Sequence, residues 1–218
     1  MFSIKICGVT TRSDGLVVAR SAADAIGLNF YPKSKRFVSR EVAREVCEAV
    51  DGQLLRIGVF VNETAEAILE TVEQTGLDAV QLHGDEPVSI LEQLKTIPVI
   101  RAFRCQEGDV SAVTEFLLRA NDAGTPPAAV LLDAYHPGEY GGTGRSLDPL
   151  SLAEGVAELG GVHWVLAGGL TPDNVGNAIE LAGPAGVDTA SGVELAPGVK
   201  DTGKVLAFAE NARAAFNQ

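Results

Sequence analysis

The sequence lacks the features of a membrane-spanning or secreted protein. No apolar run reaches the roughly 18 residues that a membrane-spanning helix needs, and the N-terminus lacks the basic and then apolar segments of a secretion signal. Cysteine is scarce as well: Cys7, Cys47 and Cys105 are far apart and form neither a CxxC pair nor a zinc-ligand spacing. We therefore expect a cytoplasmic chain with reduced thiols, no membrane partner and no bound metal.

Positive charge is also in short supply, since 17 Lys and Arg residues stand against 29 Asp and Glu residues and give a net charge of −12. A field of this sign repels a nucleic-acid backbone, so we expect no nucleic-acid partner. It also repels a small anionic substrate at long range. A site for such a substrate would need backbone N–H groups and a few nearby cations.

What the sequence does contain is a regular alternation of short apolar runs and helical patterns, which we count as eight strand–helix units. The patterns predict strands at 3–7, 25–30, 54–61, 79–82, 99–103, 129–133, 164–167 and 186–189. They predict helices at 11–23, 39–50, 62–75, 86–94, 110–121, 149–158, 171–181 and 201–215, with Ser39 and Asn62 as N-caps.

The expected strands are continuously apolar, which favours a parallel sheet covered on both faces. With 46% hydrophobic residues and no linker, the chain is expected to be of the α/β class, a single (β/α)8 TIM barrel forming one catalytic domain over residues 1–218. An open doubly wound sheet is the main alternative, because strand order is not visible in a sequence. No GxGxxG follows the first strand and no Walker motif is present, which favours the barrel.

In such a barrel the catalytic groups project from the carboxyl ends of the strands. Cys7 ends the first strand and is either a buried small side chain or a base, the latter if a cation such as Lys5 lowers its pKa. Asp133 ends the sixth strand, where a carboxyl group facing a partly dry pocket can keep its proton and act as a general acid. The long loop 134–146 argues against a simple helix cap at Asp133.

Two glycine-containing segments follow the seventh and eighth strands. Gly168–Gly169 and Ser191–Gly192 stand where barrels often bind phosphate through backbone N–H groups. Ordinary turn chemistry is the alternative, but two such segments at these two strand ends favour phosphate. The glycines of 141–144 lie inside a long loop and are more typical of a hinge or lid.

Two further side chains point to substrate binding. Arg36 lies beside aromatic and apolar residues and suits a carboxylate held in a fork geometry, whereas Lys33 and Lys35 are interpreted as surface charge. His83 has no second histidine at a metal-ligand spacing, so we expect hydrogen bonding from it rather than metal binding.

Six segments, taken together and in order, resemble one family: residues 5–10, 58–62, 81–86, 132–134 with 141–144, 166–175 and 191–194. They are similar to the phosphoribosylanthranilate isomerases of tryptophan biosynthesis. The resemblance implies an Amadori rearrangement of N-(5-phosphoribosyl)anthranilate to 1-(2-carboxyphenylamino)-1-deoxyribulose 5-phosphate, the third step of tryptophan synthesis from chorismate. The implied chemistry is acid–base catalysis without a metal or cofactor.

The resemblance also implies the roles of single residues. Asp133 matches the general acid that opens the ribose ring, and Cys7 matches the general base that removes the C2′ proton. Arg36 matches the contact to the anthranilate carboxylate, and Asp188 a polar residue near the ribose. The expected substrate-binding set is Lys5, Arg36, His83 and Asp188, and the expected phosphate-binding set is Gly168, Gly169, Ser191 and Gly192.

The chain departs from the family pattern at three places. Lys35 stands where a proline is usual, Ala190 where the first of two serines is usual, and residues 147–149 read Leu-Asp-Pro rather than Phe-Asp-Trp. We expect the first two changes to weaken substrate or phosphate contacts slightly. The acid and the base are unchanged.

Other phosphate-binding barrels are the nearest alternatives, namely the tryptophan synthase α chain and ribulose-phosphate epimerase. An epimerase would need metal-binding histidines, and the only histidines are His83, His136 and His163. A dual-substrate isomerase that also serves histidine synthesis would carry Asp in place of Cys7. A catalytically idle binding barrel would not need both Cys7 and Asp133. We expect a small-molecule partner and a monomer or homodimer.

Overall fold

The computed structural model describes residues 1–105, 109–134, 156 and 161–218. His136, the glycines of 141–144, the segment 147–149 and nearly all of the expected loop 134–146 and helix 149–158 lie outside these residues.

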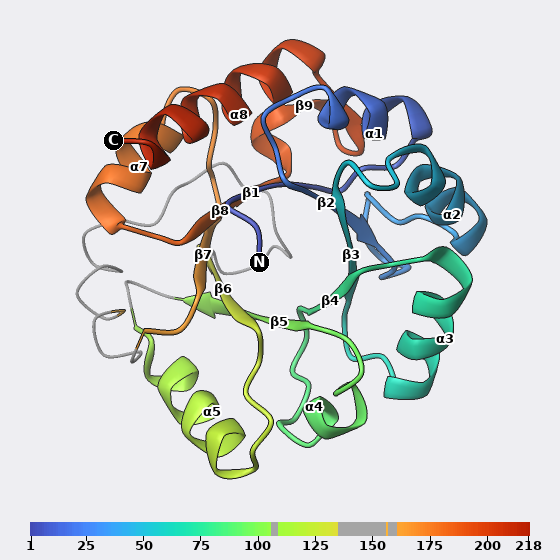
Figure 1. Ribbon diagram of the computed structural model, residues 1–218, viewed down its shortest axis with the longest axis vertical. Coiled ribbons are helices and arrows are strands. Elements are labelled where there is room, and N and C mark those ends of the chain that lie inside the picture. Colours follow the sequence, from blue (N-terminus) through green and yellow to red (C-terminus); the bar gives the residue numbers. More distant parts are fainter. Residues whose placement is uncertain (106–108, 135–155, 157–160) are drawn as a thin grey trace.

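Eight parallel strands close into a barrel in chain order, and Figure 1 shows the ring they form. Strand β1 pairs with both β2 and β8, and Lys5 stands opposite Asp188 in the second pair. The first and last strands therefore close the ring. The predicted barrel is confirmed, and the open doubly wound sheet is excluded. The strands are β1 (Ile4–Cys7), β2 (Ala25–Asn29), β3 (Leu55–Phe60), β4 (Ala79–Leu82), β5 (Val99–Cys105), β6 (Ala129–Ala134), β7 (Trp164–Ala167) and β8 (Gly186–Thr189).

Helices cover the outside of the strands (Figure 1). They are α1 (Arg12–Ala19), α2 (Arg40–Ala49), α3 (Ala65–Thr75), α4 (Ile90–Gln93), α5 (Ser111–Asp122), α7 (Val175–Ala182) and α8 (Thr202–Phe216). In the part of the chain that the structure describes, no helix has the length and apolar character needed to cross a bilayer.

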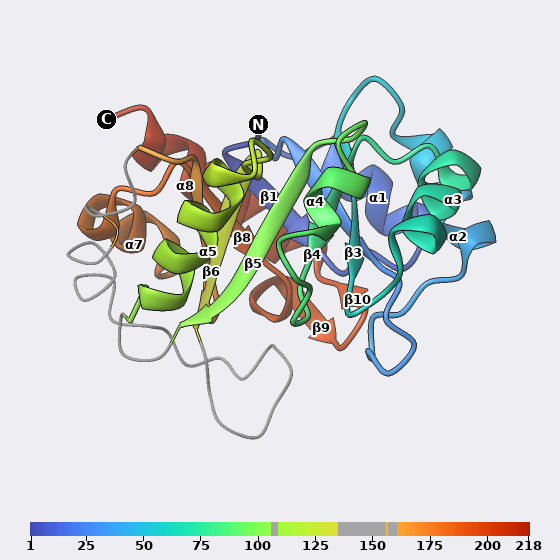
Figure 2. The same ribbon diagram turned by 90° about the horizontal axis from the view of Figure 1, so that it is seen from below.

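The apolar core has two parts. The larger joins helix residues such as Ile68 and Phe208 to strand residues such as Ile6. The smaller contains only strand residues and Phe2, and these fill the inside of the barrel. Figure 2 shows the N-terminus at one end of the barrel and the strands β9 (Glu194–Ala196) and β10 (Val199–Lys200) at the other. Phe2 thus closes the end where the strands begin and leaves the opposite end for a site.

The expected N-caps differ in outcome. Ser39 caps α2 by accepting a hydrogen bond from the backbone N–H of Val42, as predicted. Asn62 does not cap α3, because Thr64 does so. Asn62 has a left-handed φ of 54°, and its Oδ1 accepts a hydrogen bond from the backbone N–H of Asp85. Asn62 therefore joins the loop after β3 to the loop after β4. The prediction that Asn62 is an N-cap was wrong.

Two expected helices are shorter at their start than predicted. The helix expected at 86–94 is only α4, because the Glu86 carboxylate turns back to accept hydrogen bonds from the backbone N–H groups of Asn62 and Gly84. The helix expected from residue 171 starts at Val175 as α7. Before it, Asn174 accepts from the N–H of Thr171 and donates to the carbonyl oxygen of Gly169.

A short antiparallel hairpin between β8 and α8 was not predicted. It consists of β9 and β10, and a 3-10 turn (Ser191–Val193) leads into it. Gly198 allows the tight turn, with a φ of 83°. The hairpin is held to the barrel by the Thr10 hydroxyl, which donates to the carbonyl oxygen of Gly198 at 2.5 Å.

Candidate active site

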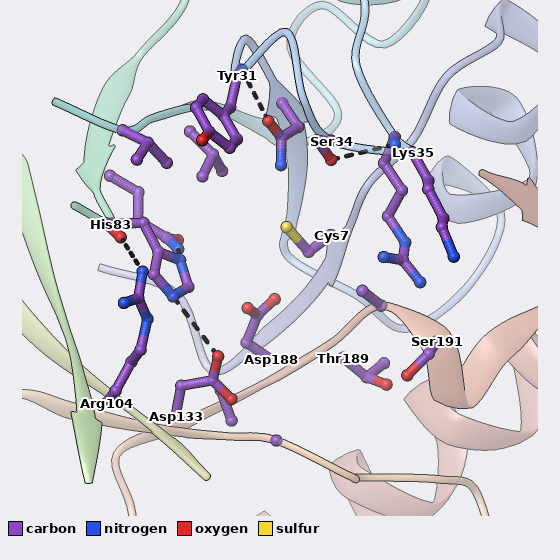
Figure 3. Close-up of a pocket in the computed structure, with 18 of the residues that line it drawn as sticks. Cys7, Tyr31, Ser34, Lys35, His83, Arg104, Asp133, Asp188, Thr189 and Ser191 are labelled. Atoms are coloured by element: carbon purple, nitrogen blue, oxygen red, sulfur yellow. Dashed lines mark hydrogen bonds and ion pairs between the residues drawn. The ribbon is translucent and has the colours of Figure 1, made fainter. Parts of the chain in front are cut away.

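A cavity of about 560 Å³ opens at the end of the barrel where the strands finish. Figure 3 shows the side chains that line it. All of the candidate site residues except Lys5 and Gly192 line this cavity. The barrel therefore brings together residues from β1, β6 and β8 and from the loops after β2, β4 and β7, as the rule for strand ends predicts.

Lys5 is fully buried behind the cavity wall. Its Nζ donates a hydrogen bond to Oδ1 of Asp188 at 2.9 Å, across the pair of strands that closes the barrel. Burial by itself lowers the pKa of Lys5, but the charges of Asp188 and Cys7 and the hydrogen bonds outweigh this, so the pKa is raised. Lys5 is thus a protonated partner of Asp188. It was predicted to bind substrate, and it is not among the residues that line the cavity.

Cys7 presents its Sγ to the cavity from the end of β1 (Figure 3). A Cβ at Gly27 would lie 2.7 Å from this Sγ and 3.1 Å from Cε of Lys5, so the glycine makes room for both side chains. Burial raises the pKa of the thiol, and the charges of Lys5 and Lys200 oppose this only in part. Lys5 lowers the pKa of Cys7, as predicted, but burial raises that pKa by more.

Asp133 lies across the cavity from Cys7, and His83 lies beside Asp133 (Figure 3). His83 Nε2 is 3.5 Å from Oδ2 of Asp133, and His83 Nδ1 is 3.1 Å from the amide nitrogen of Gln81. Arg104 donates to the carbonyl oxygen of His83 at 3.2 Å. Neither Gln81 nor Arg104 was predicted from the sequence to be a site residue. The signal for Gln81 was available, because strand residues two positions apart share a face.

The loops after β7 and β8 are packed tightly together. Gly168 and Gly169 line the cavity with φ values of 92° and 66°, which only glycine adopts readily. Gly192 does not line the cavity, but a Cβ there would overlap the carbonyl oxygen of Leu170. The Thr189 hydroxyl donates to the same oxygen at 2.7 Å. Gly192 is therefore required for loop packing, while Gly168, Gly169 and Ser191 face the cavity.

Arg36 is held by a carboxylate of the hairpin. Its Nε donates to Oε1 of Glu194 at 2.8 Å and its Nη2 donates to Oε2 at 2.7 Å, while its aliphatic chain covers Gly8. These hydrogen bonds to Glu194 raise the pKa of Arg36. Within the described residues Nη1 has no partner, so it is the part of the fork that can meet a ligand.

The carboxylate of Glu194 is shared with Lys200, whose side chain is fully buried. Lys200 Nζ lies 2.9 Å from Oε1 of Glu194. Burial raises the pKa of Glu194, but Arg36 and Lys200 together lower it below its usual value. Neither Glu194 nor Lys200 was predicted from the sequence to have a role in the site.

Comparison with known proteins agrees with this geometry. A family model described as N-(5′-phosphoribosyl)anthranilate (PRA) isomerase matches residues 4–211. The chain belongs to this family. It is 42% identical over 207 residues to the N-(5′-phosphoribosyl)anthranilate isomerase of Neisseria gonorrhoeae, which covers 94% of this chain and 93% of that protein. The resemblance inferred from the six sequence segments is confirmed.

Solved structures of phosphoribosylanthranilate isomerases have the same fold. The crystal structure of the enzyme from Thermotoga maritima matches with a TM-score of 0.84 and 39% identity, over 98% of this chain and all of that one. A second isomerase structure contains reduced 1-(o-carboxyphenylamino)-1-deoxyribulose 5-phosphate and matches with a TM-score of 0.80 and 36% identity, over 98% of this chain and 100% of that one.

Two departures from the isomerase pattern can be placed. Lys35 is an exposed residue at the rim of the cavity. Ala190 also lines the cavity, and its carbonyl oxygen accepts a hydrogen bond from Lys200 at 3.2 Å. That contact uses the main chain, so it does not depend on a serine side chain at this position.

Proposed function

We propose that this chain catalyses the rearrangement of N-(5-phosphoribosyl)anthranilate to 1-(2-carboxyphenylamino)-1-deoxyribulose 5-phosphate. The observation that carries the proposal is the position of Cys7 and Asp133, which face one cavity from opposite sides of the barrel. An isomerase needs an acid and a base on two parts of one substrate. A catalytically idle barrel has no use for this arrangement.

Asp133 is the proposed general acid. It donates its proton to the ring oxygen of the ribose, the bond between that oxygen and C1′ breaks, and a Schiff base with the anthranilate nitrogen forms. His83 Nε2, 3.5 Å from Asp133, is placed to hold the carboxyl group during this step. The Schiff base draws electrons from C1′, which makes the neighbouring C2′ proton acidic.

Cys7 is the proposed general base. As a thiolate it removes the C2′ proton, and the electron pair of the C–H bond forms the double bond of an enolamine. Tautomerisation to the amino ketone then moves the proton of the C2′ hydroxyl to C1′. Transfer of one proton through solvent from the Cys7 thiol to the Asp133 carboxylate restores the base and the acid, so no atom or electron is gained or lost overall. Because the protonated thiol cannot act as a base and burial raises its pKa, activity depends on the positive charges around it.

The remaining candidate residues are proposed to bind the two anionic ends of the substrate. Nη1 of Arg36 faces the anthranilate carboxylate, and the backbone around Gly168, Gly169 and Ser191 takes the phosphate. Asp188, paired with Lys5, lies where it can accept a hydrogen bond from a ribose hydroxyl. We further propose that residues 1–218 act as one catalytic domain, without a metal or cofactor. A monomer or homodimer and a cytoplasmic location stay predictions.

The test is the fluorescence of phosphoribosylanthranilate, followed as the purified protein consumes it. Cys7→Ala and Asp133→Asn should each lower kcat by about a hundredfold or more, while the circular dichroism spectrum and Tm stay close to those of the wild type. No consumption by the wild type would reject the function. Near-normal turnover by either variant would reject the role of that residue.

A further inference from the structure

Lys200 is a buried cation whose three N–H groups all have acceptors. Its Nζ lies 2.6 Å from the carbonyl oxygen of Cys7, 3.2 Å from that of Ala190 and 2.9 Å from Oε1 of Glu194. Burial outweighs the charge of Glu194 and lowers the pKa of Lys200 below its usual value. A neutral amine has only two N–H groups, however, so three acceptors at Nζ favour the protonated form. The ammonium thus joins the strand end that carries the proposed base to the first residue of the phosphate loop.

Glu194 uses both of its oxygens in the same network. Oε1 accepts from Nε of Arg36, from Lys200 and, at 3.2 Å, from the backbone N–H of Gly198, while Oε2 accepts from Nη2 of Arg36. One edge of the Arg36 guanidinium, formed by Nε and Nη2, is therefore held by the hairpin. Because the group is planar and rigid, the direction of Nη1 is fixed as well.

The charges around Cys7 do not cancel. In the part of the chain that the structure describes, two linked groups of charges lie on this side of the cavity: Lys5 on β1, Arg36 after β2 and Lys200 on β10 are positive, and their partners Asp188 on β8 and Glu194 on β9 are negative. One positive charge is left over beside the thiol, inside a chain whose net charge is −12. A local excess of this sign favours a thiolate and an anionic substrate.

We propose that Glu194 and Lys200 are positioning residues for the reaction, which hold the Arg36 guanidinium and the strand end of Cys7 in the geometry that binds and deprotonates the substrate. This inference rests on the proposed function. A purely structural tie is a poor explanation, because burying charged groups costs free energy that an apolar contact would not. The hairpin therefore belongs to the active site, although neither of its charged residues is assigned a step in the chemistry.

The first test is Glu194→Gln, which weakens the grip on the Arg36 fork. We expect KM for phosphoribosylanthranilate to rise about tenfold, as for the misplacement of one charge-assisted contact, while kcat changes less than about threefold. Glu210→Gln on α8 is the matched control, because Glu210 is exposed. An unchanged KM in a folded Glu194→Gln protein would overturn the role of Glu194.

The second test is Lys200→Met, read out by alkylation of Cys7 with iodoacetamide over a range of pH. Loss of the ammonium should move the alkylation profile and the rising limb of kcat/KM upward by about one pH unit. A merely structural role would lower activity equally at every pH. Cys47 and Cys105 are buried with pKa values raised to about 12, so peptide mapping can assign the reaction to Cys7. Lys204→Met is the control, because Lys204 is exposed and its Nζ donates to the backbone oxygen of Glu194 and not to the carboxylate.

The double variant Glu194→Gln/Lys200→Met serves if Lys200→Met alone does not fold, since it leaves no unpaired buried carboxylate. It should keep both the raised KM and the shifted alkylation profile. A wild-type KM and profile in this variant, with only Tm lowered, would overturn the proposal. If the wild type does not consume phosphoribosylanthranilate, the proposed function fails, but the alkylation profile still decides whether Lys200 acts on the thiol.

Discussion

Nε2 of His83 faces Oδ2 of Asp133 at 3.5 Å, and the other nitrogen of the ring faces the amide of Gln81 at 3.1 Å. When the Gln81 amide donates, Nδ1 accepts, and the proton of the neutral ring lies on Nε2 next to the proposed acid. Gln81 is almost completely buried at 1% exposure, and among the described residues its Oε1 has no hydrogen-bond partner. With its amide nitrogen toward Nδ1, Gln81 favours the histidine tautomer that can donate to Asp133.

Gln81→Met is expected to lower kcat by about tenfold, because the imidazole loses the partner that fixes its tautomer and orientation. Steady-state kinetics with phosphoribosylanthranilate give the measurement. Gln93→Met is the matched control, since Gln93 is exposed on α4. A kcat equal to that of the wild type in Gln81→Met would show that the tautomer does not matter.

The value of kcat/KM is expected to rise with pH through the neutral range. The base works only as a thiolate, and because burial raises the pKa of Cys7, the thiolate fraction is still increasing with pH there. The rate of Cys7 alkylation should follow the same curve in the absence of substrate. A kcat/KM that stays flat between about pH 6 and pH 8 would contradict this assignment of the base.

Gly192→Ala is expected to weaken phosphate binding, because the new Cβ would push the loop after β8 away from the carbonyl oxygen of Leu170. Competitive inhibition by inorganic phosphate measures the effect, and we expect its inhibition constant to rise about tenfold, as for the loss of about one backbone hydrogen bond to an anion. Gly176→Ala is the control. Gly176 lies inside α7 with no atom near its missing Cβ, so alanine there should stabilise the fold by about 0.5–1 kcal/mol. Equal inhibition constants in the two variants would contradict the role of Gly192.

Lys5→Met is expected to destabilise the fold by about 3–5 kcal/mol, because it leaves the buried Asp188 carboxylate without its cation. Urea denaturation gives the free energy of unfolding. Adding Asp188→Asn should restore part of the loss, since the double variant has no unpaired charge. Additive losses in the double variant would show that the two residues do not stabilise each other.

The sequence was sufficient to predict the barrel, because each strand is a continuous apolar run and each unit repeats the same order. The barrel in turn predicted the site, since parallel strands all end at one rim. Cys7 and Asp133 could therefore be expected to face one cavity even though they are far apart in the chain. The family resemblance added their roles, which position alone left open.

The missed features are those that depend on contacts between loops. Asparagine is a common N-cap residue, but Asn62 accepts a hydrogen bond from the loop after β4, and no local sequence pattern reveals this contact. Glu194 and Lys200 lie on a hairpin whose two strands hold only five residues, which is too short for a periodic signal in the sequence. Lys5 was predicted to bind substrate, and only the register of β1 and β8 shows that it stands opposite Asp188.

The pairing of Lys5 with Asp188 also bears on how the chain reaches its native state. The two residues are 183 positions apart, so Lys5 leaves the ribosome long before its carboxylate has been synthesised. A ring in which β1 closed against a strand other than β8 would bury the Lys5 ammonium without its carboxylate, at a cost of several kcal/mol. Closing the barrel before β8 has been synthesised therefore gains little free energy for the nascent chain. Lys5, which later neutralises Asp188, thus disfavours a barrel closed with the wrong strand.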